Sequence, residues 1–325
     1  MNTRRKFLLA LTASALGPRW AAAQRPTSHR VGWLSLDRAD GSVYFESFRT
    51  GLRELGYVEG KNLEIHARWG NESLERMASL AGELVQVGPQ VVVTQAGSAM
   101  RAMLKTGSSI PIVFAFSGDP VEAGLVDRLA RPGRNLTGVS FLALDLVGKR
   151  VELLKELLPA IRQVAVLANP EHPGDQSELR VSQEAAKKLG VSLRYHPVRS
   201  LLELDGALGE IAKARSDAVV VFPEALTLRH RGRIAEFGLK QRIPVVSGWG
   251  RYAESGCLMS YGPNLSISYR SIARFVDRIL KGASPAELPV ELPTIVELVV
   301  NSKTAKTLGI TIPQSILVRA DRVIE

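Results

Sequence analysis

Polar and aromatic side chains follow the ends of short apolar stretches, and their chemistry suits the capture of a small charged molecule. Each stretch has the length and the β-branched composition of a buried strand. Side chains just beyond the strands of a parallel sheet are where ligands bind in such folds. The candidates are Ser35, Asp37, Gln95, Gly97, Ser98, Ser117, Asp119, Asn169, Phe222, Glu224, Ser247 and Trp249.

These residue types suggest a division of roles. A helix is expected to begin at Ser98, so backbone N–H groups there would hold a carboxylate or a phosphate. Asp119 or Glu224 would take an ammonium group, and Phe222 and Trp249 would stack on an aromatic or apolar ligand body. Structural roles are the alternatives: Ser98 and Asp119 as helix caps, and Phe222 as part of the core.

The sequence contains no recognisable catalytic or metal-binding pattern. Its five histidines are scattered, without an H-E-x-x-H pair, and there is no G-x-S-x-G elbow, P-loop or G-x-G-x-x-G. Asp119 and Glu224 form a conceivable acid and base pair across a cleft, but no other residue supports that role. We therefore expect no enzyme, no cofactor and no metal.

The elements that position these residues alternate between strand and helix. Apolar strand patterns at 30–36, 63–69, 91–98 and 110–116 alternate with helical patterns at 42–56, 73–88 and 98–105. This alternation predicts an α/β fold with parallel sheets covered by helices on both faces.

The pattern then restarts. "VVVTQAG…IPIVFAFSGD" in the first half is echoed by "AVVVFPEA…IPVVSGWG" in the second, where a single helix is expected over 229–242. The repeat, in a chain of 325 residues, predicts two doubly wound lobes. We expect residues 30–141 with 264–291 in lobe one and 142–263 with 292–325 in lobe two. Three crossings, near 142, 264 and 292, would form a hinge.

The N-terminus has the layout of an export signal. A basic "MNTRRKF" precedes the apolar "FLLALTASAL", and "AAA" at 21–23 offers a cleavage site after Ala23. A signal peptide at 1–23 predicts a periplasmic protein. The pair Arg4 and Arg5 suits the twin-arginine route, and the general secretory route stays open. The one cysteine, Cys257, lies far from the signal, so no lipid-attachment cysteine follows it.

The charge of the chain does not indicate a nucleic-acid partner. The formal net charge is +10, and the four basic residues of 1–23, a segment without acids, leave +6 for the rest. The lysines and arginines are scattered and form no basic stripe, so we expect no nucleic acid as partner.

Several blocks of the chain resemble a known family. They are "GLRELGYVEGKNLEI", "IPIVFAFSGDPVEAGLVDRLARPGRNLTGVS", "KRVELLKELLP", "CLMSYGPN", "LPVELPTIVELVVNSKTAKTLGITIP" and "RADRVIE". They are similar to the ABC transporter substrate-binding protein family that includes tryptophan/tyrosine-binding members, from about Arg30 to Glu325. The resemblance implies a type I periplasmic-binding-protein fold and no catalysis. It also supports the loops at Ser98, Asp119 and Asn169 as facing the ligand.

The chain departs from the family pattern in one predicted cleft loop. Members commonly have an aromatic residue where this chain has Ser247, and an Arg-Glu pair near Gly250 and Arg251. The resemblance therefore does not by itself identify the ligand. Phe222 and Trp249 beside Ser98 favour an apolar or aromatic body with a carboxylate, an amino acid or an aromatic carboxylate.

The sequence thus predicts an exported solute-binding protein that captures a small organic ligand between two lobes and delivers it to an ABC permease in the membrane. Two other interpretations stay open. One is an exported enzyme on the same two-lobed scaffold, and the other is a ligand-binding sensor for a membrane receptor.

Overall fold

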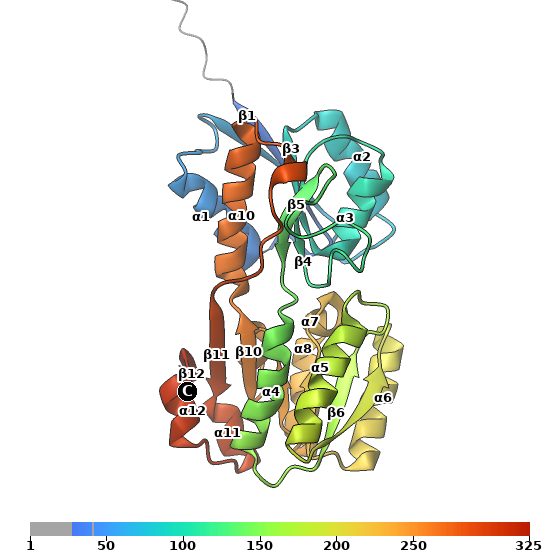
Figure 1. Ribbon diagram of the computed structural model, residues 1–325, viewed down its shortest axis with the longest axis vertical. Coiled ribbons are helices and arrows are strands. Elements are labelled where there is room, and N and C mark those ends of the chain that lie inside the picture. Colours follow the sequence, from blue (N-terminus) through green and yellow to red (C-terminus); the bar gives the residue numbers. More distant parts are fainter. Residues whose placement is uncertain (1–27, 41) are drawn as a thin grey trace, which may run out of the picture.

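Two β-sheets, one in each lobe, form the framework of the protein (Figure 1). The structure is a computed structural model that describes residues 28–40 and 42–325. The predicted signal peptide, 1–23, lies outside the described residues. Among those residues, no helix is long and apolar enough to cross a membrane.

The first sheet is entirely parallel, with the strand order β2-β1-β3-β4-β5. Its strands are β1 (His29–Ser35), β2 (Leu63–Trp69), β3 (Val91–Gln95), β4 (Ile112–Phe116) and β5 (Leu136–Ser140). The second sheet has the order β12-β11-β10-β9-β8-β6-β7. Its strands are β6 (Gln163–Ala168), β7 (Ser192–Pro197), β8 (Ala218–Val221), β9 (Val245–Ser247), β10 (Met259–Pro263), β11 (Val296–Asn301) and β12 (Arg322–Ile324).

The two strand orders correspond, which confirms the internal repeat. β2-β1-β3-β4-β5 of the first sheet matches β7-β6-β8-β9-β10 of the second. The repeated segments are therefore β3 and β4 in one lobe and β8 and β9 in the other. The second sheet departs from a purely parallel arrangement because β11 pairs antiparallel with β10. The chain returns from the first lobe directly as an extended segment, so β11 enters the sheet in the direction opposite to β10.

Helices cover the sheets (Figure 1). The first lobe carries α1 (Val43–Glu54), α2 (Met77–Val87), α3 (Ala96–Lys105), α10 (Leu265–Leu280) and the short 3₁₀ turn η1 (Pro285–Glu287). The second carries α4 (Leu144–Leu157), α5 (Asp175–Lys188), α6 (Leu201–Ala214), α7 (Ala225–Arg229), α8 (Arg231–Gln241), α9 (Gly250–Glu254), α11 (Ser302–Leu308) and α12 (Gln314–Arg319).

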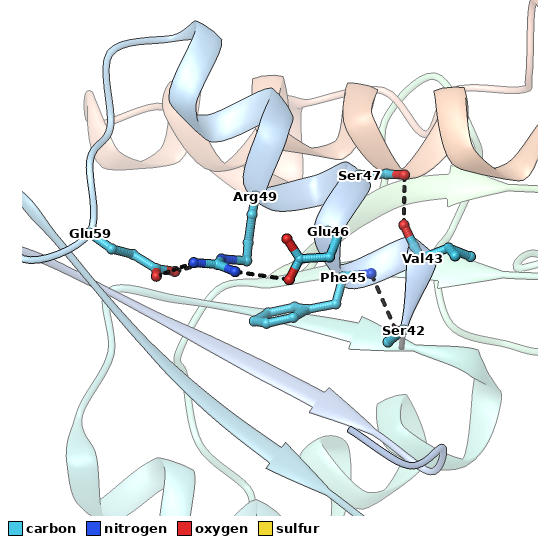
Figure 2. A network of polar contacts seen from close by, with 7 residues as sticks. All are labelled: Ser42, Val43, Phe45, Glu46, Ser47, Arg49 and Glu59. Atoms are coloured by element: carbon cyan, nitrogen blue, oxygen red, sulfur yellow. Dashed lines mark hydrogen bonds and ion pairs between the residues drawn. The ribbon is translucent and has the colours of Figure 1, made fainter. Parts of the chain in front are cut away.

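Helix α1 is held by its N-cap, by ion pairs of Arg49 and by its packing on α10. Ser42 caps its N-terminus, because the Ser42 hydroxyl accepts a hydrogen bond from the Phe45 N–H at 3.4 Å (Figure 2). Further along, Arg49 lies 2.8 Å from Glu46 and 2.6 Å from Glu59. The other face of α1 packs on α10 so closely that a Cβ at Gly51 would lie 2.2 Å from the backbone oxygen of Arg270. Only glycine allows this approach of the two helices.

The chain passes between the lobes three times (Figure 1). The first passage joins β5 to α4, and the second joins β10 to α10. In the third, the Glu291 N–H donates to the Gly138 oxygen at 3.0 Å beside β5, and the chain then continues into β11. The division of the chain at 141/142, 263/264 and 291/292 stays a prediction.

Three apolar clusters stabilise the fold. One lies within the first lobe, around Leu34, Phe114 and Phe116, and one within the second, which includes Phe222. The third is continuous across both lobes. Phe141 lies within 5.6 Å of the ring of Tyr269 and 6.4 Å of that of Trp249, so aromatic side chains join the two halves.

Two predicted helices begin or end elsewhere. The helix expected over 229–242 is two helices, α7 and α8, because a capping box between Glu224 and Thr227 starts α7 earlier and His230 interrupts the run. Helix α3 begins at Ala96 rather than at Ser98, with Gln95 at its N-cap. Ser98 therefore lies inside the first turn and caps nothing.

Candidate ligand-binding site

A cavity of about 280 Å³ lies between the lobes, beyond the carboxyl ends of the strands of the first sheet. The loop after β1, the N-terminus of α1 and the ends of β3 and β4 form one wall. Helices α7, α8 and α9 of the second lobe form the other. Both lobes therefore contribute to one binding space, which is the usual position of a ligand site between domains.

The acidic side chains of the cavity belong to the first lobe. They are Asp37, Asp40 and Glu72, accompanied by Arg38, whose guanidinium lies 4.0 Å from the Asp40 carboxylate. The Arg38 and Asp40 side chains are largely exposed, at 65% and 90%, so solvent screens this pair.

Asp37 is held in place by two neighbours. Its Oδ2 accepts a 2.6 Å hydrogen bond from the Gln95 amide, and its backbone N–H donates to the Ser35 hydroxyl at 3.0 Å. Asp37 keeps an exposed surface, yet the protein around it displaces enough water to raise the pKa of its carboxyl. Arg229 opposes this rise and Glu72 adds to it.

The second lobe contributes three cations and no acid. Arg229, Arg231 and Arg251 all line the cavity. Arg251 lies 3.2 Å from Glu254, and an Nη of Arg231 donates to the Leu228 oxygen at 2.9 Å. The Arg229 side chain makes no hydrogen bond or ion pair with any residue that the structure describes. Its guanidinium is thus available for an anionic ligand group.

Aromatic rings line the space between these charged walls. Tyr44 and Tyr269 stack with ring centres 4.7 Å apart, and Phe141 and Trp249 continue the aromatic surface. Within residues 28–40 and 42–325, the buried Tyr44 hydroxyl, Trp249 indole N–H and Gln95 amide oxygen have no hydrogen-bond partner. Buried polar groups are rarely left unpaired, and a polar ligand would satisfy such groups.

The backbone is strained beside the cavity. Glu72 and Ala96, which both line it, have φ angles of 68° and 70°. A left-handed conformation costs a non-glycine residue about 1–2 kcal/mol. Residues held in this way cluster at functional sites, so the strain supports the assignment of the cavity as the site.

The lobes also meet at a second place, which we call the inter-lobe contact and define as residues 116–119 of the first lobe and 172–174 of the second. The Ser117 hydroxyl and the His172 Nε2 lie 2.8 Å apart, and the Asp119 N–H donates to the Pro173 oxygen at 3.2 Å. Desolvation, with the charge of Arg101, lowers the pKa of His172 to about 4. The imidazole is therefore neutral at pH 7.

The structure places only some of the predicted ligand residues on the cavity. Gln95, Ser117 and Trp249 line it, together with Asp37. Ser35 lies behind Asp37 and orients it. Gly97 packs against the Phe116 ring, and neither it nor Ser98 lines the cavity.

The remaining candidates have local structural contacts. Asp119 accepts hydrogen bonds from the N–H groups of Val121 and Glu122, and Asn169 accepts one from Glu171. Glu224 caps α7, Ser247 donates to the Val221 oxygen, and Phe222 is 3% exposed in the second-lobe core. The structure does not bring these five side chains to the cavity, and their assignment to the ligand stays a prediction.

Sequence reasoning missed the arginines and the tyrosine pair. The stretch "LRHRGR" at 228–233 carried a signal, because basic residues follow a strand end within a few positions. The sequence analysis predicted only a helix over 229–242 there and assigned its basic residues no role. Tyr44 and Tyr269 come from helices distant in sequence, so their stacking had no local signature.

Metal binding is not indicated by the described residues. Within 28–40 and 42–325, no group of three or more His, Cys, Asp or Glu side chains is placed to hold a metal ion. Cys257 is buried at 1% exposure, and burial raises the pKa of its thiol to about 12, so it is neutral at pH 7.

Two repeated α/β lobes, three chain passages and a cavity between the lobes define a class of protein, the type I periplasmic binding proteins. Within that class the family is shown by sequence. The family model described as "ABC transporter substrate binding protein" matches residues 41–324. The chain belongs to this family, and it is a substrate-binding protein of the ABC transporter type.

Known relatives agree with this assignment. A curated relative from Clostridioides difficile (strain R20291), named tyrosine-binding protein, is 24% identical over 282 residues, covering 86% of this chain and 79% of the relative. The crystal structure of a conserved domain protein from Vibrio cholerae is 29% identical with a TM-score of 0.84, covering 91% of this chain and all of that one. An ABC domain from Streptococcus pneumoniae, in complex with L-Trp, is 25% identical with a TM-score of 0.84, covering 92% and 100%.

Proposed function

We propose that the protein is an exported solute receptor that binds a small organic carboxylate between its lobes and delivers it to an ABC permease. The lobes, 30–141 with 264–291 and 142–263 with 292–325, would close on the ligand about the three passages. The single observation that carries this proposal is the cavity, whose acidic and basic walls come from different lobes. A ligand that contacts both walls favours the closed arrangement, because only there do both charges reach it.

The walls suggest the chemistry of the ligand. Arg229, with Arg231 and Arg251, suits a carboxylate, and the rings of Tyr44 and Trp249 suit an aromatic or apolar body. Two relatives support this class of ligand, since one is named for tyrosine and one was crystallised with L-Trp. A more distant solute-binding protein from R. palustris was crystallised with benzoate. Amino acids and aromatic carboxylates are therefore the first compounds to test.

The site predicted from the sequence is revised in this proposal. The carboxylate is assigned to the arginines of the second lobe rather than to the backbone at Ser98. Export to the periplasm, with cleavage after Ala23 by either route, completes the proposal. Binding without catalysis is part of it too.

The enzyme alternative has one observation in its favour. Ser117 lies within hydrogen-bonding distance of His172, at 2.8 Å, as a serine nucleophile does of its base. The lowered pKa of His172, about 4, makes it a weak base at pH 7. We therefore assign this pair to the inter-lobe contact. Turnover of a bound compound, abolished in Ser117→Ala, would establish the enzyme instead.

Small-angle scattering with a thermal-shift screen tests the proposal. The screen would cover the amino acids, their desamino carboxylates and aromatic acids on the mature chain. We expect a subset to raise the melting temperature, and saturation with those compounds to reduce the radius of gyration. Stabilisation only by sugars or inorganic anions, or binding without a change in the radius, would contradict the proposal.

A further inference from the structure

The cavity contains one carboxylate whose surroundings are incomplete, Asp37. Its Oδ2 is occupied by the Gln95 amide at 2.6 Å, whereas no residue in the described ranges donates to its Oδ1. The buried Gln95 oxygen is also without a partner in those ranges. Two hydrogen-bond acceptors on neighbouring side chains thus lack donors. An ammonium group carries three donors and a positive charge, so it can donate a hydrogen bond to both acceptors.

The other acids of the cavity are less suited to this role. Asp40 is 90% exposed and lies 4.0 Å from Arg38. Glu72 is exposed, as Asp37 is, but no described residue donates a hydrogen bond to the Glu72 carboxylate. Asp37 alone among the three is fixed by a buried side chain, since Gln95 is 6% exposed. A fixed carboxylate loses little side-chain entropy when it binds a ligand, so it discriminates between ligands more sharply than a mobile one does.

The two walls also fix the direction of the ligand. The cations Arg229, Arg231 and Arg251 come from helices α7 to α9, and Asp37 comes from the loop after β1. An α-amino acid placed between them directs its carboxylate to the second lobe and its ammonium group to the first. A carboxylate without an amine satisfies one wall only. It leaves Asp37 Oδ1 without a hydrogen-bond donor from the described residues, although the charges of Arg229 and Arg231 reach Asp37.

We propose that Asp37, positioned by Gln95, is the specificity-determining residue that makes this site select α-amino acids over carboxylates of the same shape that lack the amine. The inference rests on the proposed function and goes beyond it, because it chooses between the two ligand classes left open there. Hydrogen bonds to charged groups are worth enough to give a roughly ten- to hundredfold preference.

Titration calorimetry with a matched pair of probes tests the inference. L-Tryptophan and indole-3-propionate share the ring and the carboxylate and differ in the amine; L-phenylalanine and 3-phenylpropionate form a second such pair. The wild-type chain is expected to bind the amino acid of a pair at least about tenfold more tightly. Asp37→Asn should weaken amino-acid binding to the level of the desamino compound and leave the latter nearly unchanged.

Asp127→Asn is the matched control. Asp127 belongs to the same lobe, does not line the cavity and is 64% exposed, so this variant should retain the wild-type preference. Circular dichroism would check that both variants fold. The comparison of amino acid and desamino compound on the wild-type chain tests the inference even if a variant does not fold.

The outcomes separate the inference from the proposed function. Equal binding of both members of each pair by the wild type, or an Asp37→Asn chain that still prefers the amino acid, would overturn the inference alone. If no compound of the screen binds or closes the lobes, the proposed function fails as well.

Discussion

The two lobes meet in two regions of opposite construction, the cavity and the inter-lobe contact. The cavity is formed by side chains, with acids on one wall, arginines on the other and buried polar atoms that lack partners in the described chain. The inter-lobe contact is formed largely by backbone. A Cβ at Gly118 would lie 2.4 Å from the Pro173 oxygen, and one at Gly174 would lie 3.4 Å from the Asp119 backbone nitrogen.

This difference in construction suggests different roles for the two regions: the cavity recognises the ligand, and the inter-lobe contact takes part in closure. The contact satisfies its own polar groups, through Ser117 with His172 and through Asp119 with Pro173. These groups pair with each other across the lobes, so no ligand atom is needed to complete them. The cavity has unsatisfied groups and opposed charges, which a ligand completes. We infer that the contact sets how closely the lobes approach, and the cavity sets which molecule is held between them.

Removal of a cavity cation should have the largest effect on binding. Arg229→Gln is expected to weaken the binding of L-tryptophan and indole-3-propionate alike by about 100-fold, or ~3 kcal/mol, because both lose a charge-assisted partner for the carboxylate. Titration calorimetry would measure it. Arg233→Gln is the control, since Arg233 pairs with Asp205 at 2.6 Å and does not line the cavity. Equal affinities in the two variants would mean that Arg229 does not hold the carboxylate.

Obstruction of the inter-lobe contact should have the next largest effect. Gly118→Ala places a methyl group against the Pro173 oxygen, so the lobes cannot reach the arrangement seen here. Affinity for L-tryptophan is expected to fall about tenfold, because less of the protein is competent to close. Small-angle scattering should show a larger radius of gyration at saturation than for the wild type.

Gly82→Ala is the comparison for that variant, because a Cβ at Gly82 meets no atom within 4 Å. It should bind and close like the wild type. If Gly118→Ala did so too, the inter-lobe contact would not govern closure.

Acid should weaken the inter-lobe contact, and the expected effect is on the stability of the protein rather than on its affinity for a ligand. The pKa of His172 is lowered to about 4 in the folded state, against about 6.5 when unfolded, so the unfolded chain binds more protons between these values. The contribution of His172 to stability is present above about pH 6.5 and is lost as the pH falls towards 4. Between pH 7 and pH 5 the loss should be about 2 kcal/mol, because each pH unit between the two pKa values corresponds to about 1.4 kcal/mol.

Urea unfolding at the two pH values measures this loss. His172→Gln keeps a polar side chain that does not titrate, so this variant should lose less stability than the wild type over the same interval. His196 and His230, whose pKa values are also lowered by desolvation, remain in both proteins and cancel in the comparison. Identical losses would show that His172 is not held neutral by the contact.

Part of the site could be predicted from the sequence because strand ends are recognisable locally. Gln95, Ser117 and Trp249 were predicted at such ends and line the cavity. Asp119 and Asn169 also follow strand ends, those of β4 and β6, yet their side chains accept hydrogen bonds from their own loops. Whether a polar side chain at a strand end turns to the cavity or to its own backbone depends on the loop conformation, which the pattern of residue types does not specify.

The arginines of the second lobe also show what the sequence pattern could not predict. Glu224 was predicted to contact the ligand and instead starts α7, whose last residue is Arg229. The Thr227 hydroxyl in that helix lies 2.8 Å from the Tyr252 hydroxyl, on a segment distant in sequence. The position of Arg229 thus depends on contacts that form only when the second lobe is assembled.

The sequence by itself determined the alternation of strands and helices, the repeat that produces two lobes and the sheet edge at which the cavity lies. These features follow from hydrophobic periodicity, which is a local property of the chain. Only the tertiary structure decided which charges meet across the cavity and where the lobes contact through Gly118 and Gly174. Those relations join residues more than 50 positions apart, and the packing of whole elements, rather than any local preference, brings them together.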